Sequence, residues 1–232
     1  MIKSIFYRVL ILVMVIELCF GNYAFSVNPP KREFRGAWIQ CVNGQFQGIG
    51  TEQMQKTLTR QLDELQKIGV NAIIFQVRAE CDALYPSQYE PWSKFLTGRQ
   101  GVAPTPYWDP LQWMIGQCHK RGMELHAWIN PYRAKTKTTN ELTKNHVVNQ
   151  HPERVFAYDG LYILNPGLSE NSDYICKIAE DILQRYDIDG FHIDDYFYPY
   201  PVAGKKIPDV REFSLYGGGF GNIQDWRRDN VD

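Results

Sequence analysis

The alternation of hydrophobic and polar positions repeats one unit along the chain: an amphipathic helix, a short break and a hydrophobic strand. In residues 51–80, apolar side chains recur at helical spacing, Thr51 is the expected N-cap, and Gly69 is the glycine expected just past a helix end. The run 71–78 is apolar on both of its alternating faces. Such a run is typical of a strand that is covered on both sides.

The same unit returns in residues 109–133 and 172–196, and a strand without a preceding helix begins the series. The predicted strands are 36–41, 71–78, 124–130 and 189–195, and a last helix is expected to begin near Ile223. Strands that alternate with helices and are buried on both faces predict an α/β fold with a parallel sheet.

Two parallel architectures fit this order, a doubly wound sheet and a (β/α)₈ barrel of the TIM type. No strand is followed by the glycine-rich turn that binds phosphates, which weakens the nucleotide-binding version of the first. The loops after the strands, 79–108, 131–171 and 196–222, are long, whereas the turns before the strands are short. This asymmetry favours the barrel, whose active site is built from the loops that follow the strands.

A complete barrel needs eight βα units and about 250 residues. The sequence supplies only the first four units, so we expect residues 33–232 to be the N-terminal half of a longer barrel domain. The polar stretch 134–145 is expected to be a mobile segment of a loop.

The first 26 residues are typical of an export signal. Lys3 and Arg8 give a basic start, a short apolar run follows, and small residues precede the expected cleavage site. A lipoprotein signal ending before Cys19 is the alternative, although "IEL" before it lacks the usual small residue. Residues 27–32 are expected to form a short linker. We therefore expect an exported protein, periplasmic, associated with the outer membrane or secreted, with membrane contact only through the signal or a lipid anchor.

Four cysteines follow the signal: Cys41, Cys81, Cys118 and Cys176. They are spread over predicted strands and helices rather than clustered in loops, so buried free thiols are expected instead of a disulfide framework. Sequence alone cannot choose among the three possible pairings. Cys41 and Cys81 both follow predicted strands and are the pair to test.

The chain of 232 residues has a formal net charge of −1, which offers no electrostatic basis for binding nucleic acid or an anionic membrane. Aromatic residues make up 14% of it. This share predicts either a large core or a cleft in which rings stack on sugars, because aromatic side chains offer apolar faces with polar edges.

Polar side chains gather where the four predicted strands end. Alternate residues share a face, and the carboxyl ends of parallel strands meet at one rim, so His192 is expected beside Asp194, Gln76 in line with Arg78, and His126 in line with Trp128. Trp38 is likewise expected in line with Gln40. The rim is predicted to collect Gln40, Gln76, Arg78, Trp128, Asn130, His192 and Asp194, with Arg133, Asp195, Tyr196 and Tyr198 just beyond.

Each of these residues also has a purely structural interpretation. His192 could be a core histidine, Arg78 could form an ion pair with Asp194 or Asp195, and the two tryptophans could fill the barrel. Four consecutive strands that end in polar residues at the same end nevertheless favour a functional rim.

Three kinds of chemistry compete for this rim. His192, Asp194 and Asp195 could bind a metal ion, but no HExxH motif or cysteine pair supports such a site. A serine hydrolase lacks its GxSxG turn. A carboxylate that acts on a sugar among aromatic rings fits best, and it requires neither metal nor cofactor. Because Asp194 and Asp195 point to opposite faces of a regular strand, the second carboxylate of a glycosidase is expected from another strand.

The motifs "RGAWIQ", "HAWINPYR" and "DGFHIDDYFYPYP", in this order, resemble the glycosyl hydrolase-like family 10 of bacterial envelope proteins, formerly a domain of unknown function. The resemblance runs from about Glu33 to the last residue. It implies a TIM-barrel hydrolase domain of exported proteins or lipoproteins that acts on glycans such as cell-wall strands. It also implies a domain longer than this chain.

The segment "GFHID", residues 190–194, is similar to the "GFRxD" strand of the α-amylase-type glycosidases. In those enzymes the aspartate is the nucleophile, and the arginine two residues earlier orients it. The likeness implies Asp194 as nucleophile and puts His192 in the orienting position. Histidine is neutral at pH 7 unless its pKa is raised, so Arg78 is an alternative source of positive charge.

Together these observations predict a glycosidase that hydrolyses O-glycosidic bonds in a peptidoglycan strand or another polysaccharide. Asp194, Asp195 and His192 are the predicted catalytic residues. The predicted substrate-binding residues are Trp38, Gln76, Arg78, Trp128, Asn130, Arg133, Tyr196 and Tyr198. A non-catalytic glycan-binding barrel is the alternative, and the tyrosines after the last strand could instead pack beneath the loop 196–222.

Overall fold

The computed structural model describes residues 33–194 and 197–231, and the chain from Arg35 onward forms one compact unit. The expected export signal, the linker, Asp195 and Tyr196 lie outside the described residues. Its helices are α2 (Thr51–Lys67), α3 (Lys94–Thr97), α4 (Pro110–His119), α5 (Val147–Gln150), α6 (Ser169–Arg185), α7 (Val210–Tyr216) and α8 (Ile223–Asp229), with a 3₁₀ turn at Pro152–Arg154. Its strands are β1 (Gly36–Ile39), β2 (Ala72–Arg78), β3 (Glu124–Ile129), β4 (Arg133–Lys135), β5 (Val155–Tyr158), β6 (Leu161–Leu164) and β7 (Gly190–Ile193).

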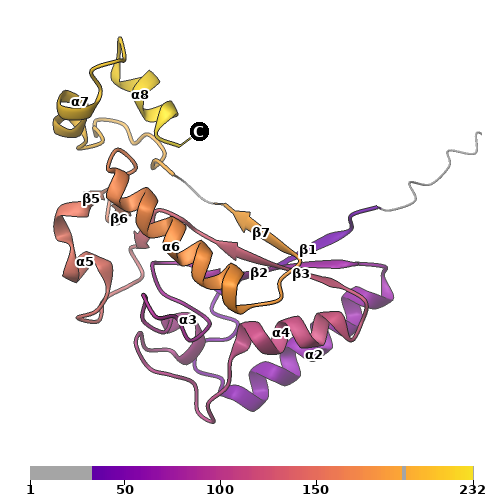
Figure 1. Cartoon of the computed structure of the whole chain (residues 1–232). Coiled ribbons are helices and arrows are strands. Elements are labelled where there is room, and N and C mark those ends of the chain that lie inside the picture. The colour runs from indigo at the N-terminus through magenta and orange to yellow at the C-terminus, as the bar shows by residue number, and fades with distance from the viewer. Residues whose placement is uncertain (1–32, 195–196, 232) are drawn as a thin grey trace, which may run out of the picture. The chain divides into compact units, whose positions relative to one another are not determined.

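The four predicted strands form one parallel sheet in the order β1-β2-β3-β7 (Figure 1). Each lies within its predicted range, and the helices α2, α4, α6 and α8 match the predicted helical patterns. The α/β fold is therefore confirmed. The order of strands in the sheet follows the order in the chain, as it does in a barrel.

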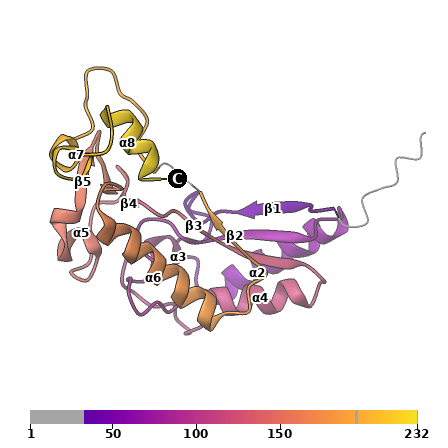
Figure 2. The same cartoon turned by 45° about the horizontal axis from the view of Figure 1, so that its top comes forward.

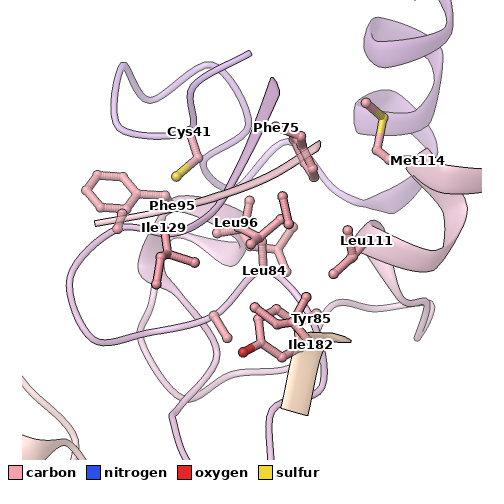
Figure 3. Close-up of a cluster of buried hydrophobic side chains, with 14 of the residues drawn as sticks. Cys41, Phe75, Leu84, Tyr85, Phe95, Leu96, Leu111, Met114, Ile129 and Ile182 are labelled. Atoms are coloured by element: carbon pink, nitrogen blue, oxygen red, sulfur yellow. The ribbon is translucent and has the colours of Figure 1, made fainter. Parts of the chain in front are cut away.

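The three long helices α2, α4 and α6 lie together on one side of this sheet (Figure 2). The main hydrophobic core fills the space between, and it includes Phe75 of β2, Leu111 and Met114 of α4 and Ile182 of α6 (Figure 3). Doubly wound folds carry helices on both faces of their sheet, so this one-sided arrangement is barrel-like. The opposite face of the sheet carries Trp38, Trp128 and His192, and the groove of the candidate site extends from there around β1 to α2.

A second, antiparallel sheet of order β4-β6-β5 lies in the segment between β3 and α6. The prediction that 134–145 is a mobile loop is therefore wrong in two respects. Ala134 lies buried in β4, and the hydroxyl groups of Thr136 and Thr139 donate hydrogen bonds to the buried carboxylate of Glu80. Two of its polar residues, Thr136 and Thr139, thus bind a buried charge, whereas others such as Asn140 and Lys144 are exposed.

The ends of α2 confirm one sequence prediction and correct another. Gly69 has a φ of +85° and donates its N–H to the carbonyl of Gln66, as expected of a glycine past a helix end. Thr51 is the first helical residue rather than the N-cap, which is Gly50. The Thr51 hydroxyl instead donates to the Pro106 carbonyl at 2.7 Å. It ties the start of α2 to the loop before α4.

Cys41, Cys81, Cys118 and Cys176 are all free thiols. The first three are buried as expected, whereas Cys176 is exposed because it lies on the outer face of α6. Burial raises the pKa of the Cys118 thiol to about 12 and raises that of Cys41 well above its usual value. Among the residues that the structure describes, no helix is long and apolar enough to span a membrane.

Candidate active site

Three ring side chains from three strands meet on the sheet face opposite the helices. The Trp38 and Trp128 ring centroids lie 4.8 Å apart with nearly perpendicular planes, and those of Trp38 and His192 lie 5.6 Å apart. Trp128 and His192 lie side by side because they hold the same register position in the parallel pairing of β3 and β7. Trp38 remains 51% exposed, whereas Trp128 is buried. The structure thus brings these predicted residues together, and their roles stay predictions.

A groove of about 770 Å³ lies along β1, and Asp194, Trp38 and Trp128 all line it. Other lining side chains come from β1, the loop after it and α2, among them Gln40, Asn43, Gln61 and Glu64. A second hollow of about 550 Å³ lies between the loops that follow β1, β2 and β4, and Asn43 lines both hollows. Volumes of this size suit a small ligand or a few sugar rings.

Asp194 directly follows β7, where its backbone N–H donates to the Ile129 carbonyl at 3.2 Å and its side chain is exposed. His192, two residues earlier, is held by the second histidine of this face: its Nε2 lies 2.7 Å from Nδ1 of His126. Partial burial lowers the pKa of His192, and the neighbouring His126 lowers it further. His192 therefore stays neutral to lower pH than an ordinary histidine.

Gln76 and Asn130 are buried side chains that bind protein groups and do not line the groove. The Gln76 amide oxygen accepts the Cys41 N–H at 3.0 Å, and its amide nitrogen donates to Asn130 at 3.3 Å. Asn130 in turn donates to the Ala79 carbonyl. The structure therefore shows two amides that brace the ends of β1, β2 and β3. Substrate contact for them is a prediction that this geometry does not support.

The prediction that Arg78 lies in line with Gln76 at the substrate-binding rim is wrong, and a β-bulge is the reason. Between Gln76 and Arg78 the register slips by one, so Gln76 pairs with Trp128 but Arg78 pairs with Ile129. An extra residue in a strand turns the following side chain to the other face. Arg78 is therefore out of line with Gln76, and it lines neither hollow.

Arg78 is instead the centre of a fully buried ion pair. Its Nε and Nη2 donate to the two carboxylate oxygens of Glu90 at 2.8 and 2.7 Å, and Nη1 donates to the carbonyls of Asn130 and Pro131. The Tyr174 hydroxyl of α6 donates to the same carboxylate at 2.8 Å. With its donors used in this way, Arg78 neither pairs with Asp194 nor supplies it with positive charge.

Tyr198 and Arg133, also predicted to bind substrate, do not line the groove either. Arg133 is half-buried in β4, where its carbonyl accepts the Cys81 thiol. The Tyr198 hydroxyl accepts a hydrogen bond from Asn230 at 3.0 Å, and the Arg227 guanidinium lies 5.7 Å from its ring centroid. Tyr198 therefore packs against α8 and the residue after it, rather than against the groove or in the predicted place beneath the loop 196–222.

Replacing Tyr198 with alanine should lower stability by about 0.5–3 kcal/mol, because the half-buried ring and its hydrogen bond to Asn230 are both lost. KM for a glycan should stay unchanged. Thermal unfolding and steady-state kinetics check the two parts. Tyr216→Ala, at an exposed position on α7, is the control that should change neither. A raised KM with unchanged stability would instead show that Tyr198 binds the substrate.

Two buried acids that sequence reasoning missed follow β2 directly, and the letters "RAECD" were their only signal. Glu80 accepts hydrogen bonds from Thr136 and Thr139, and Asp82 accepts one from Gln100 at 3.3 Å. Burial first, and then the charge of Glu80, raise the pKa of Asp82 to about 6. Glu80 thus anchors the loop after β2 to the loop after β4, and Asp82 ties together two parts of the loop after β2.

Asp82 should make the protein less stable as pH rises from about 4 to 6. The folded state keeps the Asp82 proton up to a pKa of about 6, whereas the unfolded chain releases it near 4, so folding takes up a proton in this window. The stability lost is on the order of 2–3 kcal/mol. Urea unfolding at several pH values measures it. Asp82→Asn should flatten the slope, and equal slopes in the two proteins would contradict the assignment.

The model of the family described as glycosyl hydrolase-like 10 matches residues 33–232, which is most of the chain. The chain belongs to this family. The resemblance drawn from the three sequence motifs is thereby confirmed. Family membership adds a context for Asp194 and the tryptophans without assigning a role to any single residue.

Two curated proteins that are similar to this chain are named glycosyl hydrolases. Glycosyl hydrolase YngK of Bacillus subtilis (strain 168) is 42% identical over 229 residues, which cover 94% of this chain and 44% of that protein. Glycosyl hydrolase DigH of Escherichia coli (strain K12) is 39% identical over 189 residues, which cover 76% of this chain and 42% of that protein. The chain thus spans less than half the length of these relatives.

A solved structure supports the fold. The chitobiase of Flavobacterium johnsoniae matches with a TM-score of 0.51 over 88% of this chain and 28% of its own, at 14% sequence identity. At that identity the likeness concerns the α/β fold alone.

Proposed function

We propose that the protein is a glycosidase that hydrolyses O-glycosidic bonds. The observation that carries the proposal is the shared groove, in which the exposed carboxylate of Asp194 lies with the perpendicular rings of Trp38 and Trp128. A carboxylate next to aromatic faces suits a sugar, whose ring stacks on the indoles while its hydroxyls hydrogen-bond with polar groups. Membership of a glycosyl hydrolase-like family and relatives with hydrolase names support it.

We further propose that the sheet is the first half of a (β/α)₈ barrel. Four strands in chain order with their helices on one side are what such a half would look like. The face that carries Trp38 and His192 would then line the barrel interior, and Asp194 would lie at its carboxyl rim. The second carboxylate of the reaction would come from another strand end of the barrel, because the two carboxyl groups of a glycosidase lie on either side of the bond that is cleaved.

For the substrate we propose a peptidoglycan strand or another polysaccharide of the cell envelope or the extracellular space. The export pattern of the first 26 residues supports this location. Within the site we propose Asp194 as nucleophile and the two tryptophans as stacking platforms. Asp195 and Tyr196 keep their predicted roles as proposals, since they lie outside the described residues.

Turnover by the natural full-length protein tests the proposal. The protein would be incubated with glycan strands freed of peptide and with other polysaccharides, and new reducing ends would be counted. The anomeric proton of the first product, followed by NMR, would tell retention from inversion. Binding of a glycan without turnover at any pH would favour the non-catalytic glycan-binding barrel instead.

A further inference from the structure

Glu124, His126 and His192 form a hydrogen-bonded row on the face of the sheet that carries Trp38. Oε2 of Glu124 lies 3.0 Å from Nε2 of His126, and Nδ1 of His126 lies 2.7 Å from Nε2 of His192. The two imidazole centroids are 4.9 Å apart. The row begins at the first residue of β3 and ends two residues before Asp194.

The partners in this row determine where its protons lie. A carboxylate only accepts, so the proton of neutral His126 is on Nε2 and points to Glu124. Nδ1 of His126 is then an acceptor, and Nε2 of His192 must donate to it. In neutral His192 the remaining nitrogen, Nδ1, therefore carries a lone pair and no proton.

This placement conflicts with the orienting role that the sequence likeness implied for His192. An arginine at that position would donate hydrogen bonds to the nucleophilic carboxylate. Neutral His192 has a single N–H, which His126 binds, so it offers Asp194 no donor. What His192 presents is an acceptor, which needs a donor such as a hydroxyl group. The His192 ring does not itself line the groove, but it packs against Trp38, which does.

We infer that Glu124 and His126 are positioning residues that hold His192 as a hydrogen-bond acceptor, through Nδ1, for a hydroxyl of the sugar bound at Asp194. The inference rests on the proposed glycosidase function for the identity of the ligand. It names a specificity element as well, since a sugar that lacks this hydroxyl would leave Nδ1 without its donor.

Gly190 provides the room for this row. It pairs with His126 across the two strands, and a Cβ at position 190 would lie 2.4 Å from Nδ1 of His126. Any side chain there would displace the His126 ring from His192. The glycine of the "DGFHID" segment is therefore explained by the contact between the two histidines.

The surroundings set the pH range in which the row persists. Around His192 lie His126 on β3, Asp194 on its own strand and the uncharged Trp38, while Glu124 and Asp189 act on His126. If both imidazoles were protonated, two N–H donors would face each other across 2.7 Å. Acid therefore opens the row, and the lowered pKa of His192 delays this.

The first test reads the tautomer directly. In the natural full-length protein labelled with ¹⁵N-histidine, long-range ¹H–¹⁵N spectra at neutral pH should show His192 protonated at Nε2 only. His126→Phe and Gly190→Ala should each abolish this single tautomer, and Glu124→Ala should weaken it. The side chain of Glu124 is 57% exposed, so its variant should fold even if the other two do not.

The second test uses catalysis. His126→Phe should lower kcat/KM roughly 3- to 10-fold, which is about the worth of one hydrogen bond. It should also move the acid limb of the pH profile to higher pH, because the pKa of His192 is no longer lowered by His126. His151→Phe is the matched control. His151 lies 3.2 Å from Glu153, two residues away, in an exposed pair that does not line the groove, and its loss should change neither readout.

His192 protonated at Nδ1 in the unmodified protein would overturn the inference. So would a pH profile that the His126 and Glu124 variants leave unchanged. The tautomer is measured without substrate, so a protein that hydrolyses no glycan would overturn the proposed function while the spectra still decide the inference about the row.

Discussion

Replacing Glu90 with alanine should lower the free energy of unfolding by about 3–5 kcal/mol. The side chains of Arg78 and Glu90 are both 0% exposed, so the guanidinium would keep its charge and lose the carboxylate that pairs with it. Tyr174 would lose the acceptor of its hydroxyl as well. Urea denaturation followed by circular dichroism measures the loss.

Two further variants separate the buried charge from the general effect of losing a glutamate. Glu153→Ala removes an exposed glutamate that pairs with His151, and its effect on the free energy of unfolding should be far smaller than that of Glu90→Ala. Arg78→Met combined with Glu90→Leu should be less destabilising than Glu90→Ala, because no unpaired charge remains. A loss below about 1 kcal/mol for Glu90→Ala would mean that water reaches the pair.

The sequence predicts the parallel sheet because the signals for it are local. A run that is apolar on both faces identifies β2, and helical spacing followed by Gly69 identifies α2. The gathering of Trp38, Trp128 and His192 follows from two further rules, the alternation of faces along a strand and the common rim of parallel strands. No long-range information was needed for any of these steps.

The errors concern interactions between residues distant in sequence, or patterns that carry no signal. A bulge is visible when it breaks an alternation of polar and apolar residues, but β2 is buried on both faces and shows no alternation to break. The side on which Arg78 lies could therefore not be read from the strand. Its partner Glu90 lies in a loop twelve residues away. A glutamate in a loop gives no sign in the sequence that it is buried.

The prediction of a mobile loop at 134–145 failed for the same reason, because a partner distant in the sequence decides the structure. Threonine and lysine predict a solvated loop when no buried partner is known, and Glu80 lies 56 residues before Thr136. The row of Glu124, His126 and His192 depends likewise on a pairing between β3 and β7 that the sequence predicts only as strand order. Sequence patterns therefore predict where the helices and strands lie. The environment of each polar side chain depends on contacts between these elements, which the patterns do not show.

Replacing Asp194 with asparagine should reduce glycan hydrolysis by about 10³-fold or more, since a neutral amide replaces the proposed nucleophile. The fold should be unaffected, because the Asp194 side chain is exposed and its backbone N–H still donates to the Ile129 carbonyl. Glycan affinity should persist through the tryptophans. Release of reducing ends, glycan binding and thermal unfolding of the variant, each compared with the unmodified protein, check these three statements.

Asp187→Asn is the matched control for this substitution. Asp187 is also an exposed aspartate and lies just before β7, at the opposite end of the strand from Asp194 and away from the groove lining. Its variant has the same change in charge and should keep full turnover. If Asp194→Asn retained turnover within tenfold of the unmodified protein, Asp194 would not be the nucleophile. Asp195, which the sequence places next to it, would then be the acid to replace, because a carboxylate acting at this end of β7 would have to come from one of the two.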